Sequence, residues 1–271
     1  MEIKKKYYSN NRKLTLSTVL LSIIIILPIL TLIVSTTSID GSNFKYLWDN
    51  LLYDYSFNTV YLVAITSFFA LLFGVIPAWF VSTFKFKGKN IYDFLLYLPL
   101  AIPVYIMAFT YSDILSFTGP IQSFTRKYFS NFSELLNQDY LQIEILGILM
   151  ALALYPYIYT ACRLSFSLIG SNYIELSKSL GMSKSKTFFK IVIPLSRVSI
   201  FSGLFLVVME VLNEYGAVKY FGVNTFTSGI FRSWYSMQDV ETASLLAVFL
   251  FFTVLIFFVL ERFINSKYNY S

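Results

Sequence analysis

Six long apolar runs constrain this chain more than any other feature of its sequence. They lie at residues 14–35, 56–84, 92–112, 145–162, 198–218 and 242–260. Each meets the length of roughly 17 to 25 residues that a helix needs to cross a bilayer. The third run has Asp93 at its start and is uncharged from Phe94 onward. With that exception, five of the runs carry no formal charge, whereas 198–218 contains Glu210 and Glu214. Backbone N–H and C=O groups in lipid must form their hydrogen bonds within the segment, as they do in an α-helix. The pattern therefore predicts an all-α membrane protein with six transmembrane helices.

The composition argues against several other classes of protein. The chain is 56% apolar and 13% charged, and it contains no His and a single Cys, Cys162, which we expect to be a small packing residue. A soluble enzyme, a zinc site and an internal disulfide are therefore not expected. The sequence also has no Gly-x-x-x-x-Gly-Lys-Ser/Thr phosphate loop. We predict no catalytic residue, no metal and no cofactor.

The basic residues predict the orientation of the helices. With the N-terminus in the cytoplasm, sixteen of the 21 Lys and Arg residues fall in cytoplasmic segments and five in outer loops. The net charge of +6 thus lies beside the apolar runs, where it sets topology, and nucleic acid is not expected as a partner. A cleaved signal peptide is the alternative for the first run. Its 22 uncharged residues exceed an h-region of about 7 to 15 residues, which favours a membrane span.

The segment 163–197 is longer than a turn between two membrane helices requires. Asn172 followed by Glu175 fits a capping box that starts a first short helix, and Gly181 offers the left-handed position that ends it. Ser183 is placed to cap a second helix. We therefore predict a helix-turn-helix at the membrane surface.

The second helix of this segment is predicted to run from Lys184 to Ile193 and to stop at Pro194. Its apolar and basic residues fall on different faces. On this pattern alone, an amphipathic hairpin that rests on anionic lipid remains an equal alternative.

The spacing of four residues in this segment resembles the EAA loop of ABC importer permeases. The family pattern is Glu-Ala-Ala, Gly and Ile-x-Leu-Pro, which Glu175, Gly181, Ile191 and Pro194 match at the same separations. Three positions depart from it: Leu176, Ser177 and Ile193. The resemblance implies a MetI-like, type I permease bundle in a bacterial cytoplasmic membrane. It also implies that these four residues couple the bundle to a separate ATP-binding cassette ATPase.

Two further segments resemble ferric-iron importer permeases. They are Leu98–Gln122, reading LPLAIPVYIMAFTYSDILSFTGPIQ, and Val208–Trp234, reading VMEVLNEYGAVKYFGVNTFTSGIFRSW. The resemblance implies alternating-access import of iron(III), with an extracytoplasmic substrate-binding protein as a partner. Permeases of the same architecture for sulfate, thiamine or polyamines remain alternatives.

The resemblance also bears on the assembly. Similar permeases are about twice as long and carry two six-helix halves. We interpret 1–271 as a single permease domain, for which a split subunit, a homodimerising half and a truncated product are the alternatives, and we expect a second permease unit, identical or different, beside it.

The two acids of the fifth predicted helix are the candidates for a translocation path. Glu210 and Glu214 are four residues apart, which places them on one face of a continuous helix. A carboxylate at this depth requires protein or water around it. The alternative is that both acids brace neighbouring helices through hydrogen bonds to Tyr or backbone groups.

The prolines, the tryptophans and the outer loop give further predictions. Five prolines should kink or interrupt the helices, and the outer loop 113–142 should carry a short surface helix. The three Trp residues are expected in interfacial belts. The prolines and tryptophans are Pro28, Pro77, Pro99, Pro103, Pro156, Trp48, Trp79 and Trp234. An ATP-independent channel or ion-coupled carrier that uses the acids is a second functional class, and an intramembrane enzyme is a third.

Overall fold

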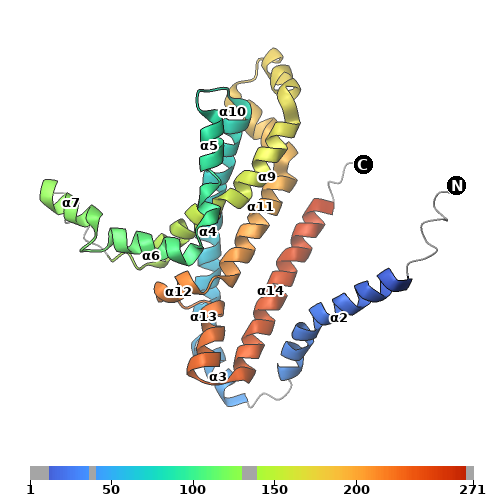
Figure 1. Cartoon of the computed structure of the whole chain (residues 1–271), viewed down its shortest axis with the longest axis vertical. Helices are drawn as coiled ribbons and strands as arrows, with labels where there is room; N and C mark the ends of the chain where they lie inside the picture. The colour runs from blue at the N-terminus through green and yellow to red at the C-terminus, as the bar shows by residue number, and fades with distance from the viewer. Residues whose placement is uncertain (1–11, 37–40, 130–138, 267–271) are drawn as a thin grey trace.

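The computed structural model describes residues 12–36, 41–129 and 139–266 (Figure 1). Within these ranges the secondary structure is helical and no strand occurs. Five helical stretches are long and apolar enough to cross a membrane: Leu14–Ser35, Leu52–Thr83, Ile143–Ile169, Lys184–Asn213 and Val240–Phe263. They belong to α2 (Arg12–Ser35), α4 (Leu52–Thr83), α9 (Ile143–Ser179), α10 with α11 (Lys184–Thr187 and Ile193–Asn213) and α14 (Val240–Ser266).

The third predicted span is broken rather than continuous. Lys89–Ala101 and Val104–Tyr128 meet at an angle of 97°, so a sixth span exists only if this bent pair counts as one. The break lies between the short helix η2 (Leu98–Ala101) and α6 (Val104–Leu115). Pro103 forces its predecessor Ile102 out of the helical region, to φ −110° and ψ 117°. The interruption that the sequence predicts at the prolines of this span is therefore confirmed at Pro103.

Prolines elsewhere in the spans have a smaller effect. Helices α2, α4 and α9 run through Pro28, Pro77 and Pro156 without interruption. Shorter helices connect the long ones. They are α3 (Gly41–Asn50), α5 (Lys89–Leu95), α7 (Pro120–Tyr128), α12 (Gly216–Tyr220), α13 (Phe226–Phe231) and the π-helical turn η4 (Arg232–Ser236). Helix α7 is the short helix predicted in the loop 113–142.

Helices α4, α9 and α11 pack together at the centre of the molecule (Figure 1). All three meet around Ile158, a fully buried residue of α9. A Cβ on Gly74 of α4 would lie 2.8 Å from the Ile158 Cβ, and one on Gly203 of α11 would lie 2.8 Å from its Cα. The small residues thus let three backbones come together, as they do in other membrane helix bundles.

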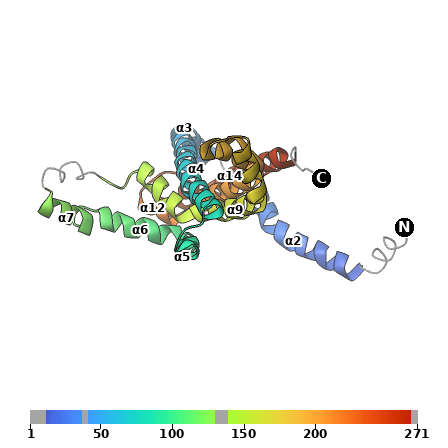
Figure 2. The same ribbon diagram turned by 90° about the horizontal axis from the view of Figure 1, so that it is seen from above.

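Two parts of the molecule extend away from this centre on different sides. Helix α2 leaves on one side, and α6 with α7 leaves on the other (Figure 2). The apolar stretch of α2 has no buried residue, and in that of α14 only 18% of the residues are buried. Such continuous apolar surfaces require lipid or another protein against them.

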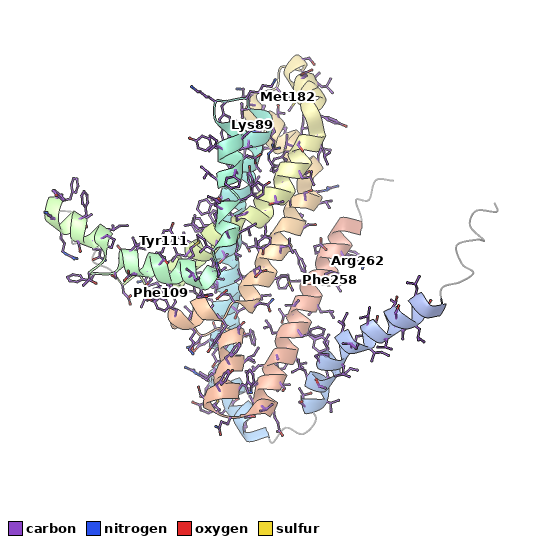
Figure 3. The ribbon with its side chains drawn as sticks, in the orientation of Figure 1. Lys89, Phe109, Tyr111, Met182, Phe258 and Arg262 are labelled. Carbon is purple, nitrogen blue, oxygen red and sulfur yellow. The ribbon has the colours of Figure 1, made fainter. Side chains whose placement is uncertain are left out.

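Different connections between the long helices lie at the two ends of the molecule. Figure 3 places Lys89 of α5 and Met182, in the connection between α9 and α10, near one end, which we call the hairpin end. The other end carries α3 and α13 and is called the α13 end (Figure 1).

Candidate functional site: the helical hairpin and the membrane acids

The first leg of the hairpin is a direct continuation of a membrane helix. Helix α9 runs from Ile143 to Ser179 without a break, so the predicted capping box at Asn172 and Glu175 does not start a helix. Capping residues start helices only where the preceding chain is not already helical. Nothing between Arg163 and Asn172 ends the membrane helix, because that stretch contains no proline and its single Gly170 is tolerated in a helix.

The turn of the hairpin has the conformation that the sequence predicts. Gly181 is left-handed, with φ 73°. The N–H of Met182 donates to the carbonyl of Ser177 at 2.9 Å, which is the six-to-one bond of a Schellman motif. A Cβ added to Gly181 would meet no atom within 4 Å, so only the backbone conformation favours glycine here.

The second leg begins as predicted and ends differently. Ser183 caps it, because its Oγ accepts from the N–H of Lys186 at 3.4 Å. Pro194 does not stop the helix but lies in the first turn of α11. The preceding residues Phe188–Val192 form a π-helical turn, in which the N–H of Ile193 donates to the carbonyl of Phe188. This wider turn accommodates the proline ring, which would otherwise crowd the carbonyl four residues earlier.

Buried hydroxyl groups hold the two legs together. The hydroxyl of Thr187 donates to Ser177 Oγ at 2.9 Å, and both residues are buried. Nearer the membrane helices, Ser165 Oγ donates to Ser196 Oγ at 2.9 Å. A buried hydrogen bond is costly to leave unmade, so these pairs fix the register of the legs. Ser177 therefore has a specific role at a position where the EAA pattern has alanine.

The four EAA-type residues lie mainly on the surface of this hairpin. Glu175, Gly181 and Pro194 are exposed, and Ile191 is half-buried. The three exposed residues are thus accessible for contact with another protein.

An apolar cavity of about 460 Å³ lies between the end of α4 and the second leg. Trp79 lies beside it, with its ring 5.2 Å from that of Phe188. At 9% exposure Trp79 belongs to the core, so its assignment to an interfacial belt was wrong. Trp48 and Trp234 are exposed. Cys162 is fully buried in the core, as a packing residue would be.

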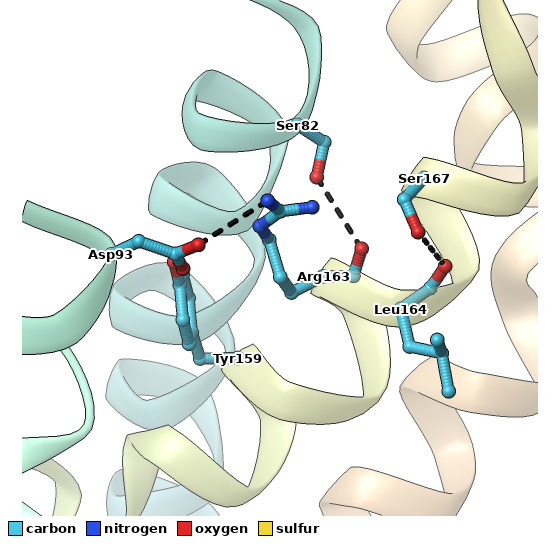
Figure 4. A network of polar contacts seen from close by, with 6 residues as sticks. All are labelled: Ser82, Asp93, Tyr159, Arg163, Leu164 and Ser167. Carbon is cyan, nitrogen blue, oxygen red and sulfur yellow. Dashed lines mark hydrogen bonds and ion pairs between the residues drawn. The ribbon is translucent and has the colours of Figure 1, made fainter. Parts of the chain in front are cut away.

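An ion pair that the sequence did not indicate joins α5 to α9 (Figure 4). Arg163 Nη2 lies 3.2 Å from Asp93 Oδ2, and the two side chains are 22% and 26% exposed. The hydroxyl of Tyr159 donates to the other carboxylate oxygen of Asp93. Asp93 lies at the start of the third predicted run and Arg163 directly after the fourth, on the same side of the membrane in the predicted topology, and this was the available signal.

The two membrane acids do not share a helix face. Helix α11 ends at Asn213, and Glu214 follows it in an extended conformation, with φ −72° and ψ 121°. Its Oε1 accepts from the N–H of Ala217 at 2.8 Å, in the first turn of α12. The predicted run 198–218 is therefore divided between α11 and α12, and Glu214 lies between the two helices with its carboxylate bonded to the start of the second.

Glu210 remains on α11 and is exposed. The hydroxyl of Tyr157 on α9 donates to its Oε1 at 3.3 Å. The acids therefore make the hydrogen bonds to tyrosine and backbone that the bracing interpretation predicts. Among the described residues, no group of three or more Cys, Asp or Glu is arranged to hold a metal ion.

Comparisons with known proteins agree with this architecture. The Fe(3+)-transport system permease protein FbpB 2 of Haemophilus influenzae is 27% identical over 94% of this chain, which spans 46% of that protein's length. The sulfate transport system permease protein CysT of Salmonella typhimurium is 25% identical over 78% of this chain and 75% of CysT. A chain of a bacterial ABC transporter involved in the import of the acidic polysaccharide alginate has the same fold. It superimposes with a TM-score of 0.77 at 16% identity, over 99% of this chain and all of that one.

A family model described as the binding-protein-dependent transport system inner membrane component matches residues 70–269. This region includes the hairpin, both acids and all the membrane helices after α4. It covers well over half of the chain. The chain is therefore a multi-pass membrane protein that belongs to the family of binding-protein-dependent transport system inner membrane components.

Proposed function

We propose that this chain is the permease subunit of an ATP-driven importer and that its hairpin couples the membrane helices to a separate ATPase. The observation that carries the proposal is the continuity of α9. One unbroken helix runs from the packed centre of the bundle to the exposed turn at Gly181 and carries Glu175 near its end. Movement of the hairpin would be passed along this helix to Ile158 in the packed centre, because no proline and no break in the helix lies between them.

The hairpin end is then cytoplasmic, as are both termini. This orientation follows the distribution of Lys and Arg, sixteen of 21 on the proposed cytoplasmic side. An extracytoplasmic binding protein would deliver cargo at the α13 end.

Iron(III) is the first proposed cargo. It is supported by the resemblance of two segments to ferric-iron permeases and by the relative FbpB 2, which aligns with 94% of this chain. A sulfate-type oxyanion is the second candidate. The relative CysT favours it, because this chain aligns with 75% of CysT but with only 46% of FbpB 2.

The proposal is tested by isolating the tagged chain from its native membrane in mild detergent. An ATPase with a phosphate-binding loop should copurify, and ATP hydrolysis should rise when the cargo-loaded binding protein is added. Uptake of radioactive iron and of radioactive sulfate into proteoliposomes then separates the two cargoes. Cargo flux through the purified chain without ATP or an ATPase would instead support a channel or an ion-coupled carrier.

A further inference from the structure

A second cavity, of about 590 Å³, lies at the α13 end, far from the hairpin turn. Its walls come from α12, the connection 222–224, α13 and η4. They include Tyr215, Lys219, Asn224, Ser228, Arg232 and Tyr235. The volume falls within the range of about 300 to 1,000 Å³ that small-molecule sites occupy.

The wall of this cavity is positively charged. Lys219 and Arg232 contribute two cations, and no carboxylate is among the lining residues. Within the part of the chain that the structure describes, neither cation belongs to an ion pair. The two acids closest in sequence are hydrogen-bonded elsewhere. Glu214 accepts from the N–H of Ala217, and Asp239 accepts from the N–H and the hydroxyl of Thr242.

Aromatic rings make one side of the cavity rigid. Tyr215 stacks on Phe231 with ring centroids 3.9 Å apart, and Phe231 is parallel to Tyr235 at 6.0 Å. The ammonium group of Lys219 lies 5.4 Å from the Tyr215 ring centre, which holds the charge beside the cavity. Asn224 and Ser228 add polar groups to the same wall.

We propose that this cavity binds a tetrahedral oxyanion of the sulfate or molybdate type on the path from the outside into the permease. Arg and Lys beside hydroxyl and amide groups are the side chains that recognise such anions. A ferric cation would meet two like charges and no carboxylate ligand here. The inference rests on the proposed importer function, and it favours the oxyanion among the two cargoes.

A phospholipid headgroup offers the same phosphate chemistry. Trp234 and Tyr235 beside the cavity are exposed aromatic residues of the kind found at membrane surfaces. The experiment therefore has two arms, carried out on the purified permease with its partner subunits in detergent. One arm measures binding of sulfate, molybdate and ferric citrate by calorimetry. The other measures phosphatidylglycerol retained by the protein, using native mass spectrometry.

The expected result is saturable binding of sulfate or molybdate that Arg232→Gln and Lys219→Gln each weaken by about tenfold or more, as loss of a charged hydrogen bond does. Arg232→Lys should retain part of the affinity. Lys127→Gln is the matched control, because Lys127 also lies over a tyrosine ring, at 5.3 Å from Tyr128, but outside this cavity.

Three results would overturn the inference. They are oxyanion binding no stronger than that of chloride, equal binding by the parent and both Gln variants, and retention of phosphatidylglycerol that depends on Arg232 without any sulfate or molybdate binding. ATP hydrolysis of the same complex is measured in parallel. If stimulated hydrolysis persists while oxyanions fail to bind, the importer function stands and only the inference about this cavity is lost.

Discussion

Gly181 shows how a single residue can control the hairpin without any packing role. Its φ of 73° disfavours residues with a Cβ by about 1–2 kcal/mol, and a branched side chain is disfavoured further. We expect Gly181→Val to abolish the stimulation of ATP hydrolysis by the loaded binding protein while membrane insertion is unchanged. Gly181→Asn, which tolerates this conformation, should retain most of the stimulation. Parental stimulation in the Val variant would remove the coupling role from this turn.

The ion pair between Asp93 and Arg163 gives a second test at the level of residues. Because both groups are about a quarter exposed, we expect a coupling energy of about 1 kcal/mol or less. Asp93→Asn and Arg163→Gln should each lower the melting temperature of the purified protein. The double variant should lose less than the sum of the two. The exposed Asp113 on α6 provides the control Asp113→Asn, which should not change melting. If the losses of melting temperature in the two single variants add up to that of the double variant, the pair does not link α5 to α9.

Among the elements, the second leg of the hairpin contains an irregular turn that we attribute to Pro194. Pro194→Ala supplies an N–H that can bond to the carbonyl of Lys190, so the π turn at Phe188–Val192 should close into a regular α-helix. Amide hydrogen exchange over 188–194 should become slower. The stimulation of ATP hydrolysis by the loaded binding protein should fall, because the straightened helix would turn the Thr187 hydroxyl away from Ser177. Pro28→Ala, in a helix without such a turn, is the control. Unchanged amide exchange over 188–194 would mean that Pro194 does not cause the π turn.

The sequence predicted helices well where long apolar runs decide the outcome and less well where local signals compete. The spans, the left-handed Gly181 and the cap at Ser183 depend on local chemistry and were predictable. The continuity of α9 through Asn172 was missed, because a capping signal inside an existing helix has no effect. The position of Glu214 depends on the side chain capping a neighbouring helix. The pairing of Asp93 with Arg163, 70 residues apart, needs the three-dimensional fold.

For the molecule as a whole, the first prediction concerns its orientation in the membrane. Lys87 and Thr118 are both exposed, and they lie on opposite sides in the proposed topology. In a Cys162→Ser background, Thr118→Cys should react with a membrane-impermeant thiol reagent in intact cells. Lys87→Cys should react only after the cells are permeabilised. Labelling of Lys87→Cys in intact cells would invert the topology.

The second prediction for the whole molecule concerns its assembly. Glu210 is exposed on a membrane helix, where a carboxylate is unfavourable against lipid, so we expect a second permease unit to cover it. Cross-linking in detergent should give two permease chains per complex. A fully active complex with one permease chain would contradict the assembly.

Glu210 also allows a test of the translocation path. If this residue lines the path, Glu210→Gln should lower cargo uptake at an unchanged protein level, whereas a residue that only braces Tyr157 leaves uptake near the parental rate.

The unbroken helix α9 has a mechanical consequence. Its 37 residues span about 55 Å of helix, and Ile158, near its middle, is held by close contacts with α4 and α11. The part from Ile158 to Ser179 contains no proline and forms an arm of about 31 Å, with this crossing as its pivot. A tilt of this arm by about 5° displaces the hairpin turn by about 3 Å. A stroke of that size at the hairpin would therefore reach the crossing of the three helices as a small rotation, and Pro156 marks the place beyond it where the rest of α9 can bend instead of following.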